Sequence, residues 1–295
     1  MKLENKELLS NYVKLVEDSL YKYNVVTEDT QLHRSVIDAM NYSLSAGGKR
    51  LRPVLAMEFC KVCGGSIQDA LDVACCIEMI HTSSLIHDDL PCMDNDDFRR
   101  GKPSCHKQFE ESIALLAGDN LLIKPFEVVA KNSSLNDTTK VKIMETLSMG
   151  VSSIIGGQVL DLENEHRKDV TEEILLKTYT KKTSDLIKTA CVCGCLCANK
   201  HQDYIPLACE YAENLGIAFQ IIDDILDVTS TQEVLGKPIG SDQEQNKTTF
   251  ITLFGLQTAQ KKAKVYTGKA LKVLTQMDNS DFLIDLTNNL LNREY

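Results

Sequence analysis

The spacing of apolar residues constrains the fold of this chain more than any other sequence feature. Apolar side chains recur three and four residues apart along almost the whole sequence, and the apolar–polar alternation of a half-buried strand is nearly absent. The ranges with this helical period are 4–22, 31–45, 53–63, 67–89, 106–131, 137–163, 171–200, 204–228 and the C-terminal third. The sequence therefore predicts an all-α protein.

Residues that end helices agree with these ranges. Gly64-Gly65 follows one helical range, and Pro91 prevents the helix over 67–89 from continuing. That range is apolar almost all round, so we expect a central helix covered by neighbours on several sides. No linker rich in Pro, Gly or Ser divides the chain, and residues 1–295 are predicted to form a single domain.

The composition excludes several classes of protein. Forty-two acidic residues against thirty-two basic ones give a net charge of -10, which disfavours non-specific binding to nucleic acid or to anionic membranes. No run of eighteen apolar residues occurs and "MKLENKELLS" lacks an apolar signal core, so we expect no membrane span and a cytoplasmic location. Eleven cysteines without a secretory signal predict reduced thiols.

Four of the cysteines alternate with other residues in "CVCGCLC", at Cys191, Cys193, Cys195 and Cys197. On a helix this spacing spreads the thiols around the axis, so we interpret them as small buried packing residues. A metal site is the less favoured alternative, both here and for the pair Cys60 and Cys63.

Two clusters of aspartates end two of the long helical ranges. The first cluster is Asp88, Asp89 and Asp94, and the second is Asp223, Asp224 and Asp227. The second can converge within one helical turn, whereas Asp94 must return on the loop after Pro91. Carboxylates this close repel one another unless hard cations neutralise them, and Mg²⁺ commonly joins such carboxylates to substrate phosphates. One cluster alone would be typical of a solvated helix end, but two together favour a magnesium-dependent phosphate site.

Basic and polar residues accompany the aspartates. The stretch "GGKRLRP" supplies Lys49, Arg50 and Arg52, and Arg99 and Arg100 follow the first cluster; arginine forks suit phosphate oxygens. His81 lies two helical turns before Asp88 on nearly the same face, although a lone histidine on a buried helix is more often a core residue. Other residues would each be interpreted alone as solvated surface: Lys182, Thr183, Gln220, Lys237 and Lys247.

Five motifs occur in a definite order: "GGKRLRP", "HDDLPCMDNDDFRRGKP", "KKTSDLI", "FQIIDDILD" and "LGKPIGSD" with "NKTTF". In order and spacing they resemble the motifs of the trans-prenyl diphosphate synthases, the farnesyl and geranylgeranyl diphosphate synthase family. The resemblance implies a bundle of long antiparallel helices around a deep central cavity, usually in a homodimer. It also implies a Mg²⁺-dependent prenyltransferase that joins isopentenyl diphosphate head-to-tail to an allylic diphosphate.

The resemblance also implies roles for the residues that match the motifs. Three Mg²⁺ ions on the allylic diphosphate would be held by Asp88, Asp89, Asp94, Asp223, Asp224 and Asp227. That diphosphate would also contact Arg99, Lys182, Lys237 and Lys247. Isopentenyl diphosphate, bound without metal, would contact Lys49, Arg52, His81 and Arg100. The candidate catalytic residues are Lys182, Thr183 and Gln220, of which the last two would lie near the allylic carbon.

The implied chemistry accounts for so much opposed charge in one place. Cleavage of the allylic C–O bond leaves negative charge on the departing diphosphate, which divalent cations and basic side chains stabilise. The double bond of isopentenyl diphosphate then attacks the allylic cation, and the departed diphosphate takes up the proton. We therefore expect no Ser-His-Asp nucleophile, but we do expect a site shielded from water.

Product length in this family depends on the side chains four and five residues before the first aspartate, here Ser84 and Ser83. Farnesyl-forming bacterial relatives usually carry an aromatic residue at the position of Ser83, so the serine favours a C20 over a C15 product. Ile80 and Ile77 would be the next bulky residues below. In the alternative, another helix closes the floor and restores C15, through Leu115, Leu116 or Phe126.

Two other functions are compatible with a helical fold of this kind. A terpene cyclase shares the first acidic motif but needs no isopentenyl site, so Lys49, Arg52 and the full second motif argue against it. A non-catalytic partner subunit would be expected to have lost aspartates, whereas all six are present.

Overall fold

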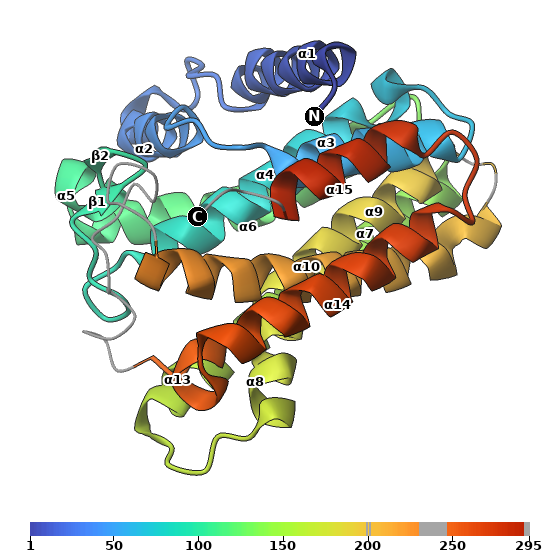
Figure 1. Ribbon diagram of the computed structural model, residues 1–295. Helices are drawn as coiled ribbons and strands as arrows, with labels where there is room; N and C mark the ends of the chain where they lie inside the picture. The colour runs from blue at the N-terminus through green and yellow to red at the C-terminus, as the bar shows by residue number, and fades with distance from the viewer. Residues whose placement is uncertain (199, 201, 230–246, 292–295) are drawn as a thin grey trace.

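The computed structural model describes residues 1–198, 200, 202–229 and 247–291, and the chain within them is almost entirely helical (Figure 1). The α-helices are α1 (Leu3–Leu20), α2 (Arg34–Leu44), α3 (Leu51–Val62), α4 (Ile67–Asp88), α5 (Cys105–Phe109), α6 (Glu111–Lys131), α7 (Asp137–His166), α8 (Glu172–Tyr179), α9 (Asp185–Ala198), α10 (Ile205–Thr229), α13 (Phe250–Phe254), α14 (Leu256–Leu274) and α15 (Asp281–Leu291). Short 3₁₀ turns are η1 (Tyr21–Tyr23), η2 (Gln31–His33) and η4 (Gln202–Tyr204). The prediction of an all-α fold is confirmed.

Two predicted helical ranges are interrupted. Within 106–131, Glu110 has a φ of +75° and separates α5 from α6. Within 171–200, a single π-helical turn, η3 (Thr180–Ser184), joins α8 to α9. The structure also contains a small antiparallel hairpin, β1 (Phe98–Arg99) and β2 (Lys102–Pro103), that the helical period did not predict because each strand has only two residues.

The prediction of a central helix over 67–89 is confirmed by α4. A capping box starts it: Asp69 N–H donates to the Ser66 hydroxyl at 3.3 Å, and Ser66 N–H donates to the Asp69 carboxylate at 2.8 Å. Its neighbours include α3, α6 and α9, so its apolar side chains are buried on several sides. The polar end of α4 thus emerges from the core at Asp88.

The other helix that ends in aspartates, α10, packs against α9, α14 and the π-turn η3. Figure 1 shows α10 and α14 side by side, α1 and α2 across one side of the bundle, and α8 with α13 on the opposite side. The first half of α10 is anchored in the core by Tyr211, whose ring centroid lies 5.5 Å from that of Phe59. As in α4, the carboxylates come at the end of a helix that is mostly buried.

Helix α7 has an unusually exposed apolar surface. Within the described residues it is the one helix long and apolar enough to cross a membrane by length and composition, with mean hydropathy 1.2 over eighteen residues, 28% of which are buried. Its exposed apolar side chains are Val141, Met149, Ile155 and Val159. The neighbouring α6 exposes Leu115, Leu116 and Ile123. We call these seven residues the α6–α7 apolar face.

Candidate active site

The first aspartate cluster forms where α4 ends and the chain turns back. Asp94 N–H donates to the Asp88 carbonyl at 2.9 Å, so the loop after Pro91 returns Asp94 to the helix end, as the sequence predicted. Burial raises the pKa of Asp88 to about 6, and the nearby charges of Asp94 and Asp89 act in the same direction. This helix end therefore concentrates carboxylates in partly desolvated surroundings.

Asp89 is already neutralised by an arginine. Its carboxylate is 2% exposed and accepts from Arg99 Nε at 2.9 Å and 3.2 Å, one distance for each oxygen. The hairpin β1–β2 carries Arg99 to this position, and Asp96 lies 3.3 Å from the same guanidinium. Asp89 and Arg99 thus form a fork-like pair in which each residue orients the other.

Lys182 lies opposite this cluster and is held by a residue that the sequence did not single out. Its ammonium donates to Asp161 Oδ2 of α7 at 2.5 Å. Burial alone would lower the pKa of Lys182, but the carboxylates of Asp161, Asp88 and Asp94 outweigh burial and raise it. An acidic residue within the apolar stretch "GGQVLDL" is the signal that could have identified Asp161.

The π-turn η3 places Lys182 and Thr183 at the site. One extra residue in the turn shifts the helical register, so neighbouring side chains point in directions that a regular helix would not allow. Helix α7 approaches η3 closely at Gly157, where a Cβ atom would lie 2.6 Å from Lys182 Cα. The absence of a side chain at Gly157 allows the two backbones to touch.

In the second cluster, Asp224 is bound by donors of the protein itself. Asp224, 3% exposed, accepts hydrogen bonds from the Tyr179 hydroxyl, from Phe250 N–H at 3.0 Å and from Gln220 Nε2 at 3.4 Å. Asp227 is also buried, whereas Asp223 is only partly buried. The charge of Asp223 raises the pKa of Arg52, but burial of Arg52 lowers that pKa by more. Tyr179 and Phe250 are further site residues; Phe250 ends the motif "NKTTF" but had no predicted role, and Tyr179 was not singled out.

The predicted catalytic residues Thr183 and Gln220 are in contact. Thr183 Oγ1 donates to Gln220 Oε1 at 2.9 Å, and the amide nitrogen of Gln220 faces Asp224 on the next turn of α10. These two residues therefore connect η3 to the second cluster. Their assigned role near an allylic carbon stays a prediction.

Three of the four residues assigned to isopentenyl diphosphate come together. Arg52 Nη1 lies 3.3 Å from His81 Nε2, and the Arg100 guanidinium donates to the Gly47 carbonyl. Gly48, with a φ of +125°, permits this approach because a Cβ atom there would lie 2.6 Å from Arg100 Cζ.

The charges of this cluster favour an anion. Burial lowers the pKa of Arg52 to about 10, and it lowers the pKa of His81 well below 6.5, in the same direction as the nearby arginines. Arg52 Nε is buried and has no partner among the described residues. We call Arg52, His81 and Arg100 the arginine–histidine cluster.

The other basic residues of the motifs have different surroundings. Lys49 Nζ lies 5.5 Å from the centroid of the Phe219 ring. Arg50 is buried and paired with Glu78 at 2.7 Å, which gives it a structural role in the core. Lys247 Nζ lies 3.6 Å from Asp94 Oδ1, so it reaches the first cluster from the C-terminal part of the chain. Lys237 lies outside the described residues.

Of the two serines expected to set product length, Ser83 is buried on α4 and Ser84 is half-buried. Ser83 is 1% exposed, and the Ser84 hydroxyl donates to the His81 carbonyl at 2.8 Å. Ile80 and Ile77 are fully buried on the preceding turns. Of the three residues that the alternative named as a possible floor, Leu115 and Leu116 are 45% and 50% exposed on α6, and Phe126 packs against the core.

The clustered cysteines are packing residues, as predicted. Cys191, Cys193 and Cys195 are completely buried and Cys197 is 7% exposed.

Among the residues that the structure describes, no group of three His, Cys, Asp or Glu side chains is arranged to hold a metal ion on its own. A Mg²⁺ ion does not need three such side chains, because it commonly takes one or two carboxylates and fills its other positions with water and substrate phosphate.

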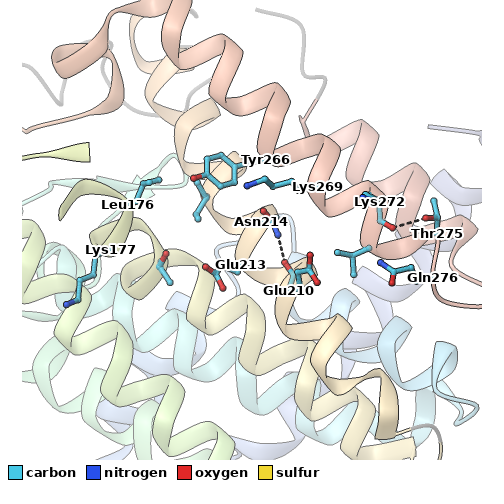
Figure 2. A pocket seen from close by; sticks show the side chains of 13 residues that line it. Leu176, Lys177, Glu210, Glu213, Asn214, Tyr266, Lys269, Lys272, Thr275 and Gln276 are labelled. Atoms are coloured by element: carbon cyan, nitrogen blue, oxygen red, sulfur yellow. Dashed lines mark hydrogen bonds between the residues drawn. The ribbon is translucent and has the colours of Figure 1, made fainter. Parts of the chain in front are cut away.

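A separate groove of about 740 Å³ lies between α8, α10 and α14 (Figure 2). It is lined by Lys177, Lys269 and Lys272 and, from α10, by Glu210 and Glu213, and contains none of the predicted site residues. A cavity of about 20 Å³ lies beside Asp89 and Arg99. Neither is the deep central cavity implied by the resemblance, which stays a prediction.

Comparisons with known proteins agree with the geometry. A family model described as polyprenyl synthetase matches residues 33–281. The chain is 41% identical over 286 residues to a geranylgeranyl diphosphate synthase of Cyanophora paradoxa, covering 93% of this chain and 95% of that protein. It is 37% identical over 292 residues to a farnesyl diphosphate synthase of Bacillus subtilis (strain 168), covering 97% of each.

Solved structures share the whole fold. An FPP/GFPP synthase from Zymomonas mobilis superposes with a TM-score of 0.87 at 29% identity, over 99% of this chain and 100% of that chain. A geranyltransferase from Helicobacter pylori, complexed with magnesium and isoprenyl diphosphate, gives a TM-score of 0.85 at 29% identity, over 99% and 98% of the two chains. The chain belongs to the polyprenyl synthetase family.

Proposed function

We propose that this prenyltransferase condenses isopentenyl diphosphate head-to-tail with allylic diphosphates and releases geranylgeranyl diphosphate, the C20 product. The observation that most strongly supports the condensation of two diphosphates is the presence of two different anion sites. One combines carboxylates with Lys182 and Lys247, as a metal-bound diphosphate requires. The other, the arginine–histidine cluster, has basic groups without a surplus of carboxylates, as a diphosphate bound without metal requires.

The first site would hold the allylic diphosphate. Asp88 and Asp94 stand beside each other at the end of α4, and their oxygen donors fit Mg²⁺. We propose three ions, shared between the two aspartate clusters, and such ions neutralise charge on the leaving diphosphate. Lys182 and Lys247 would bind the oxygens of the same allylic diphosphate, since both ammonium groups already interact with the charge of Asp94.

The second site would orient isopentenyl diphosphate. His81 stays neutral because burial and the neighbouring arginines oppose its protonation, so its imidazole can accept from Arg52 or donate to a phosphate oxygen. The buried Nε of Arg52 supplies a donor that needs an acceptor. A terpene cyclase would have no use for this second cluster.

The product length depends on the α4 surface below Asp88. Ser83 and Ser84 leave the first bulky side chains to Ile80 and Ile77, one and two turns deeper, which supports C20. The relatives include both geranylgeranyl and farnesyl synthases at similar identity, so C15 is the second candidate. The outward position of Leu115 and Leu116 weighs against these two as its floor, whereas Phe126 packs against the core.

The direct test incubates the purified protein with Mg²⁺, isopentenyl diphosphate and, separately, each allylic diphosphate, followed by chromatography of the dephosphorylated products. We expect geranylgeraniol as the longest main product. Farnesol alone would support the C15 alternative, and the absence of any elongated product would contradict the proposal.

Replacement of Ser83 by Tyr tests the proposed floor. The ring would occupy the space below the first cluster, so we expect the main product to change from C20 to C15 in the same assay. Thr82→Val, also on α4 and also buried, is the control and should leave product length unchanged. A Ser83→Tyr variant that folds normally by circular dichroism and still makes C20 would show that the floor lies elsewhere.

We also propose a homodimer, formed through the α6–α7 apolar face. Seven large apolar side chains are exposed on these two neighbouring helices, and large exposed apolar patches commonly mark interfaces. A second copy of the chain would cover this face and bury its apolar groups. We also propose a cytoplasmic location, where eleven free thiols would stay reduced.

A further inference from the structure

The Asp224 carboxylate faces protein donors at both of its oxygens. The Tyr179 hydroxyl and Phe250 N–H, at 3.0 Å, both donate to Oδ2, and Gln220 Nε2 faces Oδ1 at 3.4 Å. Phe250 N–H also lies 3.3 Å from the Tyr179 hydroxyl oxygen, so these three groups form a closed triangle. The triangle is buried, since Asp224 is 3% exposed and Phe250 is fully covered.

Phe250 is the end of a short segment that crosses the site. Residues 247–250 lead into α13, and we call them the strap. At its first residue, Lys247 Nζ lies 3.6 Å from Asp94 Oδ1. In its middle, the Thr248 hydroxyl donates to the Asn164 carbonyl at 3.5 Å. The strap therefore runs from the first aspartate cluster to the triangle, and Asp224 holds its far end.

We infer that Asp224 and Tyr179 form a latch that anchors the strap and so positions Lys247 over the first aspartate cluster. Asp224 is then a positioning residue, and under the proposed function its neighbour Asp223 would bind the metal. A hydrogen bond from a backbone N–H to a buried carboxylate is stronger than one between neutral groups, which suits an anchor for a short segment. Only two residues, Thr248 and Thr249, separate Phe250 from Lys247, so anchoring one restricts the other.

The latch also connects the strap to the π-turn. Gln220 accepts from Thr183 at 2.9 Å and faces Asp224 with its amide nitrogen, so Thr183, Gln220, Asp224 and Phe250 form one chain of contacts. Lys182, next to Thr183, and Lys247, close to Phe250, reach the first cluster from opposite ends of this row of contacts. That the two lysines act on one diphosphate rests on the proposed function, whereas the latch itself does not.

Hydrogen–deuterium exchange of the metal-free protein tests the latch without substrate. Tyr179→Phe keeps the ring and removes the hydroxyl, and Asp224→Asn keeps the shape and removes the charge. In both variants we expect backbone amides of residues 247–254 to exchange at least about tenfold faster, the effect of losing one charge-assisted hydrogen bond. Tyr211→Phe, which removes a buried hydroxyl bonded to Thr287, is the matched control and should leave this peptide unchanged.

A second measurement separates anchoring from metal binding. In Asp224→Asn and Tyr179→Phe we expect a higher KM for the allylic diphosphate and an unchanged Mg²⁺ concentration at half-maximal rate. In Asp223→Asn we expect this Mg²⁺ concentration to rise. Unchanged exchange at 247–254 in either latch variant would overturn the inference. So would a Mg²⁺ requirement that rises in Asp224→Asn as much as in Asp223→Asn. A protein that makes no elongated product would contradict the proposed function and leave the exchange result standing.

Discussion

Asp161 shows how one carboxylate can position a distant cation. It lies near the C-terminal end of α7, away from both aspartate clusters in the sequence, yet it holds the ammonium of Lys182 at 2.5 Å. Lys182 also lies within the field of Asp88 and Asp94. The ammonium therefore interacts both with Asp161, which holds it in place, and with the carboxylates of the proposed diphosphate site.

Removal of that partner should weaken the site without unfolding the chain. For Asp161→Asn we expect kcat/KM for the allylic diphosphate to fall about tenfold to hundredfold, because a charged hydrogen bond that orients Lys182 is lost. Steady-state kinetics measures this. Glu172→Gln, which removes the partner of Lys262 on the surface, is the control and should change kcat/KM by less than about twofold. An equal effect of both substitutions would contradict a positioning role for Asp161.

His81 should make the protein less stable in mild acid. Its folded pKa lies well below 6.5, so as pH falls below 6.5 the unfolded chain binds a proton that the folded chain does not, and stability is lost. The loss grows as the pH falls further below 6.5. In His81→Gln we expect this part of the pH dependence to disappear from urea denaturation curves. His33→Gln, on the exposed surface, should retain it.

The π-turn is the element most sensitive to its neighbours. At Gly157 a Cβ atom would contact the backbone of Lys182, so Gly157→Ala must displace η3 or α7. We expect the free energy of unfolding to fall by about 1 to 3 kcal/mol and kcat to fall with it. Thermal denaturation and steady-state kinetics measure the two effects.

The adjacent residue provides the control for this substitution. A Cβ atom at Gly156 would meet nothing within 4 Å, so Gly156→Ala should stabilise α7 by about 0.5 to 1 kcal/mol through helix propensity. If Gly157→Ala were stabilising too, the close approach of α7 and η3 would not be needed.

The helices themselves could be predicted because burial of an apolar stripe leaves a period in the sequence, as in α4 and α10. The breaks could not. Glu110 and the turn Thr180–Ser184 lie inside helical patterns, and their irregular backbone depends on packing against other elements, such as Gly157 of α7. The hairpin that presents Arg99 is too short to leave any period.

The surface of the whole molecule predicts its assembly. The α6–α7 apolar face includes Met149 and Ile155, which are 67% and 55% exposed. We expect Met149→Asp with Ile155→Asp to convert a dimer into a monomer, because buried charges in the interface would lack partners. Analytical ultracentrifugation measures this. Val265→Asp, at an exposed apolar position on α14, is the control, and a wild-type chain that sediments as a monomer would contradict the homodimer.

The sequence by itself determined the helical fold, the family and the positions of the charged motifs, because periodicity and the order of motifs are properties of the chain alone. Only the tertiary structure decided which charges face each other. It paired Asp89 with Arg99 and brought Asp161 to Lys182, contacts of 2.9 Å and 2.5 Å that no local pattern encodes. It also turned Asp224 toward Tyr179 and Phe250, because the direction of a carboxylate depends on the donors that packing places around it.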